Sequence, residues 1–292
     1  MQTIQNSKLE VSIRSIGAEI CSIRSVASGK EFMWNGDPSI WGSFAPVLFP
    51  IIGSLKEGIF LFKEKEYSIH KHGFIRNNKN LRLNKVSEQC VEYSLKYDEV
   101  SLLSYPFKFE FLIRFILSGN SILVEHEVFN HDADESMYFS LGGHPAFKCP
   151  INESEAYGDY YLEFEKNETI DKWEVLSNGL IGNDSTRLLE KSNIILLKTN
   201  LFDHDALIIK THQSRKVSLR SKLSKESVIV HYSDFPYLGI WAKPGGKFVC
   251  IEPWLGISDA WDTDQNFETK EGIIKLGAHS KYNASYTIVI EE

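Results

Sequence analysis

The stretch FKFEFLIRFIL, at residues 107–117, has an apolar side chain at every second position. These side chains are Phe107, Phe109, Phe111, Ile113, Phe115 and Leu117. In an extended chain, alternate side chains point to the same face, so the stretch predicts a strand with one buried and one polar face. Apolar residues alternate in the same way over 91–97, and Ser-Gly-Asn at 118–120 supplies a turn signal. This region therefore predicts half-buried antiparallel strands.

The same period of two recurs along almost the whole chain. It is found at 8–14, 121–129, 160–165, 193–197, 206–210, 216–220, 227–232, 237–243, 247–252 and 286–292. Helical periodicity is scarce, and only PSIWGSF (38–44) and EVLSNGL (174–180) suggest a turn or two of helix. Because no helix alternates with the strands, we expect an all-β protein, a large antiparallel β-sandwich, rather than a parallel α/β sheet. No repeat or linker divides the chain, so residues 1–292 are expected to form a single domain, with a loop at about 152–159.

Composition excludes several classes of partner. Lys and Arg total 32 against 39 Asp and Glu, a net charge of -7, and no basic stripe is present, which argues against nucleic acid. No apolar stretch approaches the roughly 20 residues that span a bilayer, and the polar beginning lacks the features of a secretory signal. We expect a cytoplasmic monomer or homodimer without membrane contact. The four cysteines have no CxxC spacing, which predicts reduced thiols and no metal site.

The segment GGHPAFKCP, at 142–150, holds a histidine between two glycines and a proline. Gly142 and Gly143 let the main chain bend and approach other groups closely, while Pro145 biases His144 toward an extended conformation. The imidazole is therefore held in one direction. Such a histidine serves either a turn or a reaction.

The segment KHGFIRNN places His72, Phe74 and Arg76 at alternate positions. If the segment is extended, all three side chains project from one face. Taken alone, the pattern favours a structural interpretation, with a solvated Arg, a hydrogen-bonded His and a core Phe.

In FVCIEPW, Glu252 follows a strongly apolar strand at the point where we expect that strand to leave its sheet. Glu is almost never fully buried unless it is paired, so this carboxylate either has partners or faces a pocket. Trp254 lies two positions on, on the same side of an extended chain. An aromatic face beside a carboxylate suits a sugar ring, although Trp254 and Trp241 are each also typical core residues.

Five segments form a set when taken in order: PVLFPIIGSLKEG, KHGFIRN, GGHPAF, DALI and CIEPWLGISD, from Pro46 to Asp259. Together they resemble the aldose 1-epimerase (galactose mutarotase) superfamily, specifically its LacX-like branch. The resemblance implies a galactose mutarotase-like β-sandwich, with a sugar bound in a shallow cleft on the concave sheet. It also implies an isomerase that needs no metal or organic cofactor.

In such enzymes a glutamate takes the proton of the anomeric hydroxyl, and a histidine protonates the ring oxygen and opens the pyranose. Carried over by motif, the resemblance makes Glu252 the general base and His144 the general acid. It makes His72 and Arg76 bind sugar hydroxyls or stabilise charge at the ring oxygen. Phe74 and Trp254 are added as expected binding residues because aromatic faces suit a sugar ring. The Asp that grips sugar hydroxyls falls at Asp205, and Asp203 fits almost as well.

The motifs depart from those of better-studied galactose mutarotases. Their first histidine motif is richer in glycine than KHGFIR, and their glutamate strand commonly continues toward a polar residue where this chain has EPW. A related branch acts on hexose 6-phosphates, and a phosphate contact is available from lysines, which are otherwise rim residues: Lys56, Lys71, Lys243 and Lys247. Free and phosphorylated aldohexoses therefore both remain candidate substrates.

Two other functions stay open at this point. One is a noncatalytic sugar-binding or sugar-sensing protein that has the cleft without turnover. The other is a metal hydrolase, disfavoured because its candidate ligands lack a compact spacing: His70, His72, His144, Asp203 and His204.

Overall fold

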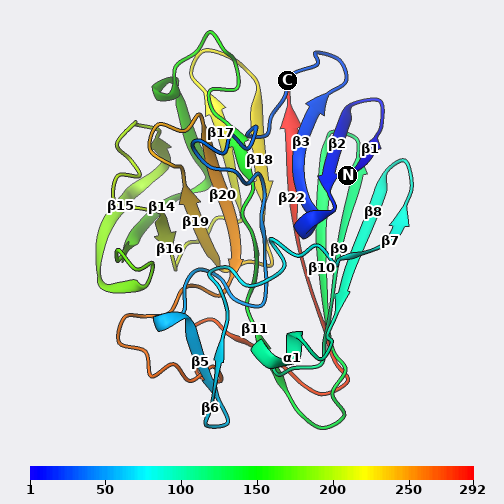
Figure 1. Ribbon diagram of the computed structural model, residues 1–292. Helices are drawn as coiled ribbons and strands as arrows, with labels where there is room; N and C mark the ends of the chain where they lie inside the picture. Colours follow the sequence, from blue (N-terminus) through cyan, green and yellow to red (C-terminus); the bar gives the residue numbers. More distant parts are fainter.

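The computed structural model describes residues 1–292 and consists almost entirely of β-strands, which confirms the expected all-β class (Figure 1). Fifteen strands form one large antiparallel sheet. Thirteen of them lie in the order β4 (Val47–Leu48), β12 (Leu141–Gly143), β20 (Phe248–Leu255), β19 (Tyr237–Trp241), β16 (Leu207–Ile209), β14 (Tyr160–Val175), β17 (Lys216–Ser221), β18 (Ser227–His231), β22 (Lys281–Glu291), β10 (Ser121–Asn130), β9 (Phe109–Ser118), β8 (Cys90–Lys96) and β7 (Arg82–Val86). The other two are β13 (Ala146–Lys148), paired with β20, and β15 (Ile181–Leu196), paired with β14.

A second, three-stranded sheet lies over the half of the large sheet that contains β22, β10, β9 and β8 (Figure 1). Hydrogen bonds join the two layers, from the Gln5 N–H to the Glu88 carbonyl and from the Asn6 side chain to the Gly119 carbonyl. The strands of the three-stranded sheet are β1 (Gln2–Gln5), β2 (Leu9–Arg14) and β3 (Glu19–Ser25). Two-stranded sheets and helices of three or four residues complete the fold: β5 (Ile59–Phe62) with β6 (Lys65–Ser68), β11 (Met137–Phe139) with β21 (Ile274–Leu276), α1 (Ser101–Ser104) and 3-10 helices at Ile16–Ala18, Lys56–Gly58 and Tyr157–Asp159.

Strand β9 shows why the period-two pattern is decisive. From Phe109 to Leu117 every odd-numbered residue is buried and every even-numbered one is only partly buried. The buried face joins a single cluster of 70 buried apolar residues that includes both layers. Phe49 lies within it, with its ring 5.5 Å from that of Phe109 and 6.0 Å from that of Phe74. The apolar pattern therefore reports the inward face of each layer.

Three local expectations are wrong. PSIWGSF forms a turn and irregular chain, and EVLSNGL begins with the last two residues of β14 and continues as a turn. Neither is helical, because Pro38, Gly42 and Gly179 interrupt any helical run. HGFIR is a turn rather than an extended segment, since His72 and Gly73 both have positive φ, +67° and +76°. Strand β20 does not end at Glu252 but continues through Pro253 to Leu255, paired with β19 as far as Trp254.

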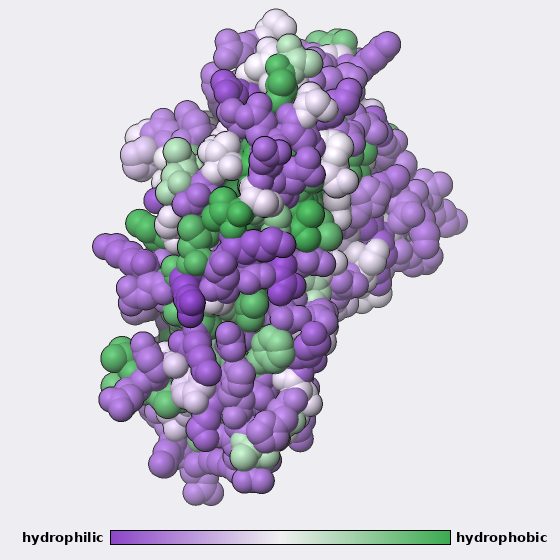
Figure 2. Space-filling model, turned by 90° about the vertical axis from the view of Figure 1, so that its right-hand side faces the viewer, coloured by the Kyte–Doolittle hydropathy of each residue, from purple (hydrophilic) through white to green (hydrophobic).

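The outward positions of the strands are mostly polar. Figure 2 shows one face of the molecule on which hydrophilic residues predominate and hydrophobic residues form small, separate patches. Among large apolar side chains, Leu103 in α1 and Val100 just before it are among the most exposed. The structure contains no helix with the length and apolar character needed to cross a bilayer.

A buried ion pair lies within the segment that connects β20 to β21. Lys270 Nζ lies 2.8 Å from Asp259 Oδ1, and both side chains are almost completely buried. Lys270 also donates to the Ile257 carbonyl, and the other Asp259 oxygen accepts the Lys56 N–H at 2.9 Å. The pair thus links the loop after β20 to the GSLKEG segment near β4.

Replacing Lys270 by Met is expected to lower the free energy of unfolding by roughly 3–5 kcal/mol, because it leaves a buried carboxylate without its cation. Urea denaturation measures this change. The control is Lys281→Met, which removes the exposed partner of Glu127 and is expected to cost no more than about 1 kcal/mol. Equal losses in the two variants would contradict the structural role of the Lys270–Asp259 pair.

Candidate active site

Strand register places His144 directly opposite Glu252. Strands β12 and β13 both pair with β20, and their partners include Gly142 with Trp254 and Ala146 with Cys250. Both antiparallel pairs have residue numbers that sum to 396, and so do 144 and 252. The break between β12 and β13 at His144 and Pro145 therefore falls across from the glutamate. Directly opposed side chains on one face of a sheet lie about 5 Å apart at Cβ.

The two glycines before His144 are required by space. A Cβ on Gly142 would lie 2.8 Å from the Pro253 carbonyl oxygen and 2.9 Å from the Trp254 ring. A Cβ on Gly143 would lie 2.7 Å from the Tyr286 hydroxyl. Neither glycine has positive φ, so they serve close approach rather than a left-handed bend. Gly142 lets β12 approach β20 closely, and Gly143 makes room for Tyr286 of β22, so that His144 lies against the carboxylate.

His144 and Glu252 are in direct contact at the floor of a cleft of about 500 Å³. His144 Nε2 lies 3.3 Å from Glu252 Oε2, and the residues are 7% and 1% exposed. Sequence reasoning expected the two groups to face each other across a pyranose; instead they lie side by side. His144 Nδ1 and Glu252 Oε2 have no hydrogen-bond partner within the protein. Buried polar atoms without partners are costly, and here they border a space that a polar ligand can enter.

Burial sets the protonation of this pair. It lowers the pKa of His144 to about 3, with the positive charges of Arg76 and Lys71 acting in the same direction. It raises the pKa of Glu252 well above the ordinary value near 4.5, and the charge of Lys71 opposes that shift. A neutral carboxyl beside a neutral imidazole holds as many protons as a carboxylate beside an imidazolium. One proton transfer across 3.3 Å therefore interconverts the two forms.

His72 lies beside His144 in the cleft, with its ring centroid 5.5 Å away. The Gly53 N–H donates to His72 Nδ1 at 3.1 Å, so the neutral ring carries its proton on Nε2. Burial lowers the His72 pKa well below 6.5, and His144 and Arg76 act in the same direction. His72 is thus a neutral hydrogen-bond donor.

Arg76 brings a positive charge to the same cleft. Its Nε is buried without a partner, and one terminal nitrogen lies 3.5 Å from Ser43 Oγ. Burial lowers the Arg76 pKa, whereas the charges of Glu19 and Glu252 raise it. A guanidinium remains protonated under such conditions, so Arg76 has free donors for an oxygen ligand.

Aromatic rings form the walls. Trp41 stacks on the His144 ring at 5.1 Å and meets Trp241 edge-on at 5.5 Å. Trp254 lines the cleft, 5% exposed, and a Cβ on Gly239 would lie 2.5 Å from its indole. Sequence reasoning missed Trp41, although a Trp in the polar, Pro- and Gly-containing PSIWGSF segment was a signal.

The acidic candidates line the cleft, whereas one aromatic candidate does not. Asp203 and Asp205 both border it and are exposed, and the charge of Asp205 raises the Glu252 pKa. Phe74 is a correction: it is half-buried outside the cleft, and its ring packs against Phe49 and Tyr105 of the core. The left-handed His72–Gly73 turn breaks the alternation that would have placed Phe74 beside His72 and Arg76.

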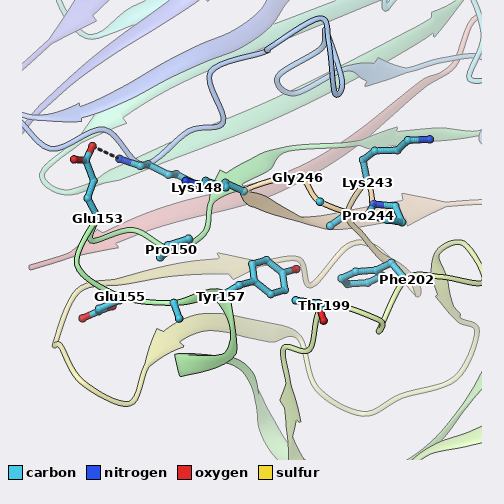
Figure 3. A pocket seen from close by; sticks show the side chains of 14 residues that line it. Lys148, Pro150, Glu153, Glu155, Tyr157, Thr199, Phe202, Lys243, Pro244 and Gly246 are labelled. Atoms are coloured by element: carbon cyan, nitrogen blue, oxygen red, sulfur yellow. Dashed lines mark ion pairs between the residues drawn. The ribbon is translucent and has the colours of Figure 1, made fainter.

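A second cavity, of about 680 Å³, has the lining residues shown in Figure 3. The cavity and the cleft share Phe202, Lys243 and Pro244. No histidine lines this cavity, whereas His72, His144 and Glu252 all line the smaller cleft. Of the four lysines considered above, Lys71 and Lys243 border the cleft and Lys247 borders the second cavity, while Lys56 borders neither and donates to the Thr263 carbonyl.

The ligand set of the metal hydrolase is not brought together. Across the chain, one group of three or more His, Cys, Asp or Glu side chains converges, and it consists of His144, Cys250 and Glu252. His204 is exposed, and His70 lies at a different surface depression. The hydrolase hypothesis therefore has no structural support. All four cysteines are free thiols, as expected.

Comparison with known proteins shows the family and the fold type of this chain. The family model for aldose 1-epimerase matches residues 1–272. The plasmid-encoded protein LacX of Lactococcus lactis subsp. lactis is 34% identical, covering 98% of each chain. A galactose mutarotase related enzyme from Lactobacillus acidophilus superposes with a TM-score of 0.94 at 36% identity, over 100% of this chain and 97% of the other. A galactose mutarotase-like protein from Lactobacillus casei gives 0.93 at 28% identity, covering both chains completely.

The matches extend over nearly the whole chain and include the strands that carry the cleft. The fold is therefore of the galactose mutarotase-like type, and this protein belongs to the aldose 1-epimerase family.

Proposed function

We propose that this protein is a mutarotase that interconverts the α and β anomers of an aldohexose or hexose phosphate. The observation that carries the proposal is the 3.3 Å contact between a buried imidazole and a buried carboxyl at the floor of an open cleft. Ring opening requires one group to remove the proton of the anomeric hydroxyl and another to protonate the ring oxygen. Both oxygens are bonded to C1. Family membership supports the same class of reaction.

The proposed step uses the pair in its charged form. Glu252 accepts the proton of the anomeric hydroxyl while His144 donates a proton to the ring oxygen, so that the C1–O5 bond breaks and the C1 carbonyl forms. Rotation about C1–C2 exposes the other face of the aldehyde. Reclosure returns both protons. Because both reacting oxygens are bonded to C1, an acid and a base in mutual contact are suitably placed for them.

The remaining cleft residues have binding roles in this proposal. Arg76 and the neutral His72 donate to sugar oxygens, including the ring oxygen as charge develops there. Asp205 or Asp203 accepts from hydroxyls farther along the ring. Trp41, Trp241 and Trp254 pack on the apolar C–H faces of the sugar. The site requires no cofactor for these steps.

The direct test is polarimetry or exchange NMR on freshly dissolved α-anomers. The panel consists of free aldohexoses and their 6-phosphates. The protein should make at least one of these sugars reach anomeric equilibrium faster than it does in buffer alone. Calorimetry on the same panel reports binding. Binding without acceleration would select the noncatalytic sugar-binding alternative, and failure of both would sink the proposal.

A further inference from the structure

We infer that His144, Glu252 and Cys250 form a binding site for a thiophilic divalent cation, of which Zn²⁺ is the type, and that the cation competes with sugar for the cleft. This inference goes beyond the proposed function, because it concerns a ligand that blocks the acid–base pair.

The donors come from a small part of the sheet. Cys250 and Glu252 are two residues apart on β20, so their side chains share a face. His144 stands opposite Glu252 in the register, and Ala146 on the same side of the break pairs with Cys250. One imidazole nitrogen, one sulfur and one carboxylate oxygen consequently lie within 4.8 Å of one another.

These distances suit a metal after a small contraction. In a tetrahedral zinc site, bond lengths of about 2.0–2.3 Å place ligand atoms roughly 3.3–3.8 Å apart. His144 Nε2 and Glu252 Oε2 already lie 3.3 Å apart, so the adjustment is about 1 Å at the thiol. Three protein ligands leave the fourth position for water from the cleft.

A second, independent observation concerns an unsatisfied atom. Glu252 Oε2 is buried without a hydrogen-bond partner, and its one contact at ion-pair distance is His144 Nε2, 3.3 Å away. Lys71 and Arg76 act on it only as nearby charges. A divalent cation would neutralise the carboxylate and the thiolate together, releasing their protons to solvent.

Nitrogen, sulfur and oxygen donors in one site favour Zn²⁺ over Mg²⁺ or Ca²⁺, which prefer oxygen alone. The metal then occupies the Glu252 oxygen that would accept a proton and the His144 nitrogen that would carry one. Cys250 has no part in the proposed sugar chemistry, since it is completely buried and does not line the cleft. Its thiol is thus the residue that separates metal binding from mutarotation.

The experiment is calorimetric titration of untagged protein with ZnCl₂, with Co²⁺ absorption as a report on thiolate ligation. Wild type should bind one Zn²⁺, and Co²⁺ should give a thiolate charge-transfer band. Cys250→Ala should weaken Zn²⁺ binding by at least about tenfold and abolish that band, with mutarotation unchanged. Cys149→Ala is the matched control, since Cys149 is equally buried and outside the donor group. If Cys250→Ala folds poorly, Cys250→Ser replaces it.

Saturating sugar should weaken Zn²⁺ binding, and Zn²⁺ should inhibit wild type far more than Cys250→Ala. Wild type that binds no Zn²⁺, or Cys250→Ala that binds it as tightly as wild type, would overturn the inference. Because binding is measured directly, it stands apart from the proposed function. Metal binding without any mutarotation would refute only the enzyme, and mutarotation without metal binding would refute only the site.

Discussion

Glu252→Gln is expected to lower the acceleration of mutarotation by roughly 10²–10⁴-fold, because an amide cannot accept the anomeric proton. Polarimetry with the best sugar of the panel measures the loss. Gln preserves the size of the side chain, so the cleft and its binding of sugar should persist. A variant that retains most of the wild-type rate would remove Glu252 from the mechanism.

The pH dependence of the wild type follows from the same carboxyl. The reactive form of the Glu252–His144 pair holds one proton, which His144 delivers, and burial raises the pKa at which the pair loses this proton to solvent above the ordinary carboxyl value near 4.5. Above that pKa Glu252 is a carboxylate but His144 has no proton to donate, so the rate should fall as pH rises through it, with the alkaline limb lying above pH 4.5. A rate that rises over the same pH range would contradict this assignment.

Stability supplies the control for Glu252→Gln. A carboxyl whose pKa is raised in the folded state binds its proton more tightly there, so its favourable contribution is complete at low pH and is lost as pH rises through the folded pKa. The variant has no such group. Its free energy of unfolding, relative to wild type, should increase as pH rises from below 4.5 to neutrality. Urea denaturation at several pH values also shows whether the fold is intact.

His144→Ala is expected to reduce mutarotation by a similar factor, about 10²–10⁴-fold, since no other group contacts Glu252 and can protonate the ring oxygen. The substitution leaves a space beside Trp41 the size of an imidazole. Added imidazole should then restore part of the rate, which a merely structural histidine would not allow.

The matched control is His212→Ala. His212 is also 7% exposed and has no partner for either ring nitrogen, but it lies against Tyr232 outside the cleft. Its replacement should leave the rate near that of wild type. Equal losses at positions 144 and 212 would point to a general effect on folding instead of proton transfer.

Sequence patterns predicted the structure correctly where they concern which face of a single strand is buried. Phe109 to Leu117 could be assigned an inward face, because alternation in a strand depends only on the chain itself. The conformations of the short segments PSIWGSF and HGFIR were predicted wrongly, because contacts with residues distant in sequence determine them. Glu19, far away in sequence, accepts the Phe44 and Ala45 N–H groups, and Gly73 presses on the Phe49 carbonyl.

The candidate site shows the same division. Glu252 and His144 were identified by resemblance, and the Cys250–Glu252 spacing was visible in CIEPW, but the convergence of Cys250 with His144 was not foreseen. That convergence depends on the register of β12 and β13 against β20, which hydrogen bonds and the Gly142 and Gly143 contacts set. Trp41 likewise enters the cleft through a loop with no periodic pattern.

The sequence by itself determined that this chain forms antiparallel strands and which side of most strands faces inward. Both properties follow from side-chain alternation, which is local. Only the tertiary structure decided that His144 touches Glu252, that a donor atom of Cys250 lies within 4.8 Å of theirs, and that Phe74 packs against the core instead of the cleft. Strand register and left-handed turns are set by contacts between distant segments, and no short window of sequence contains those contacts.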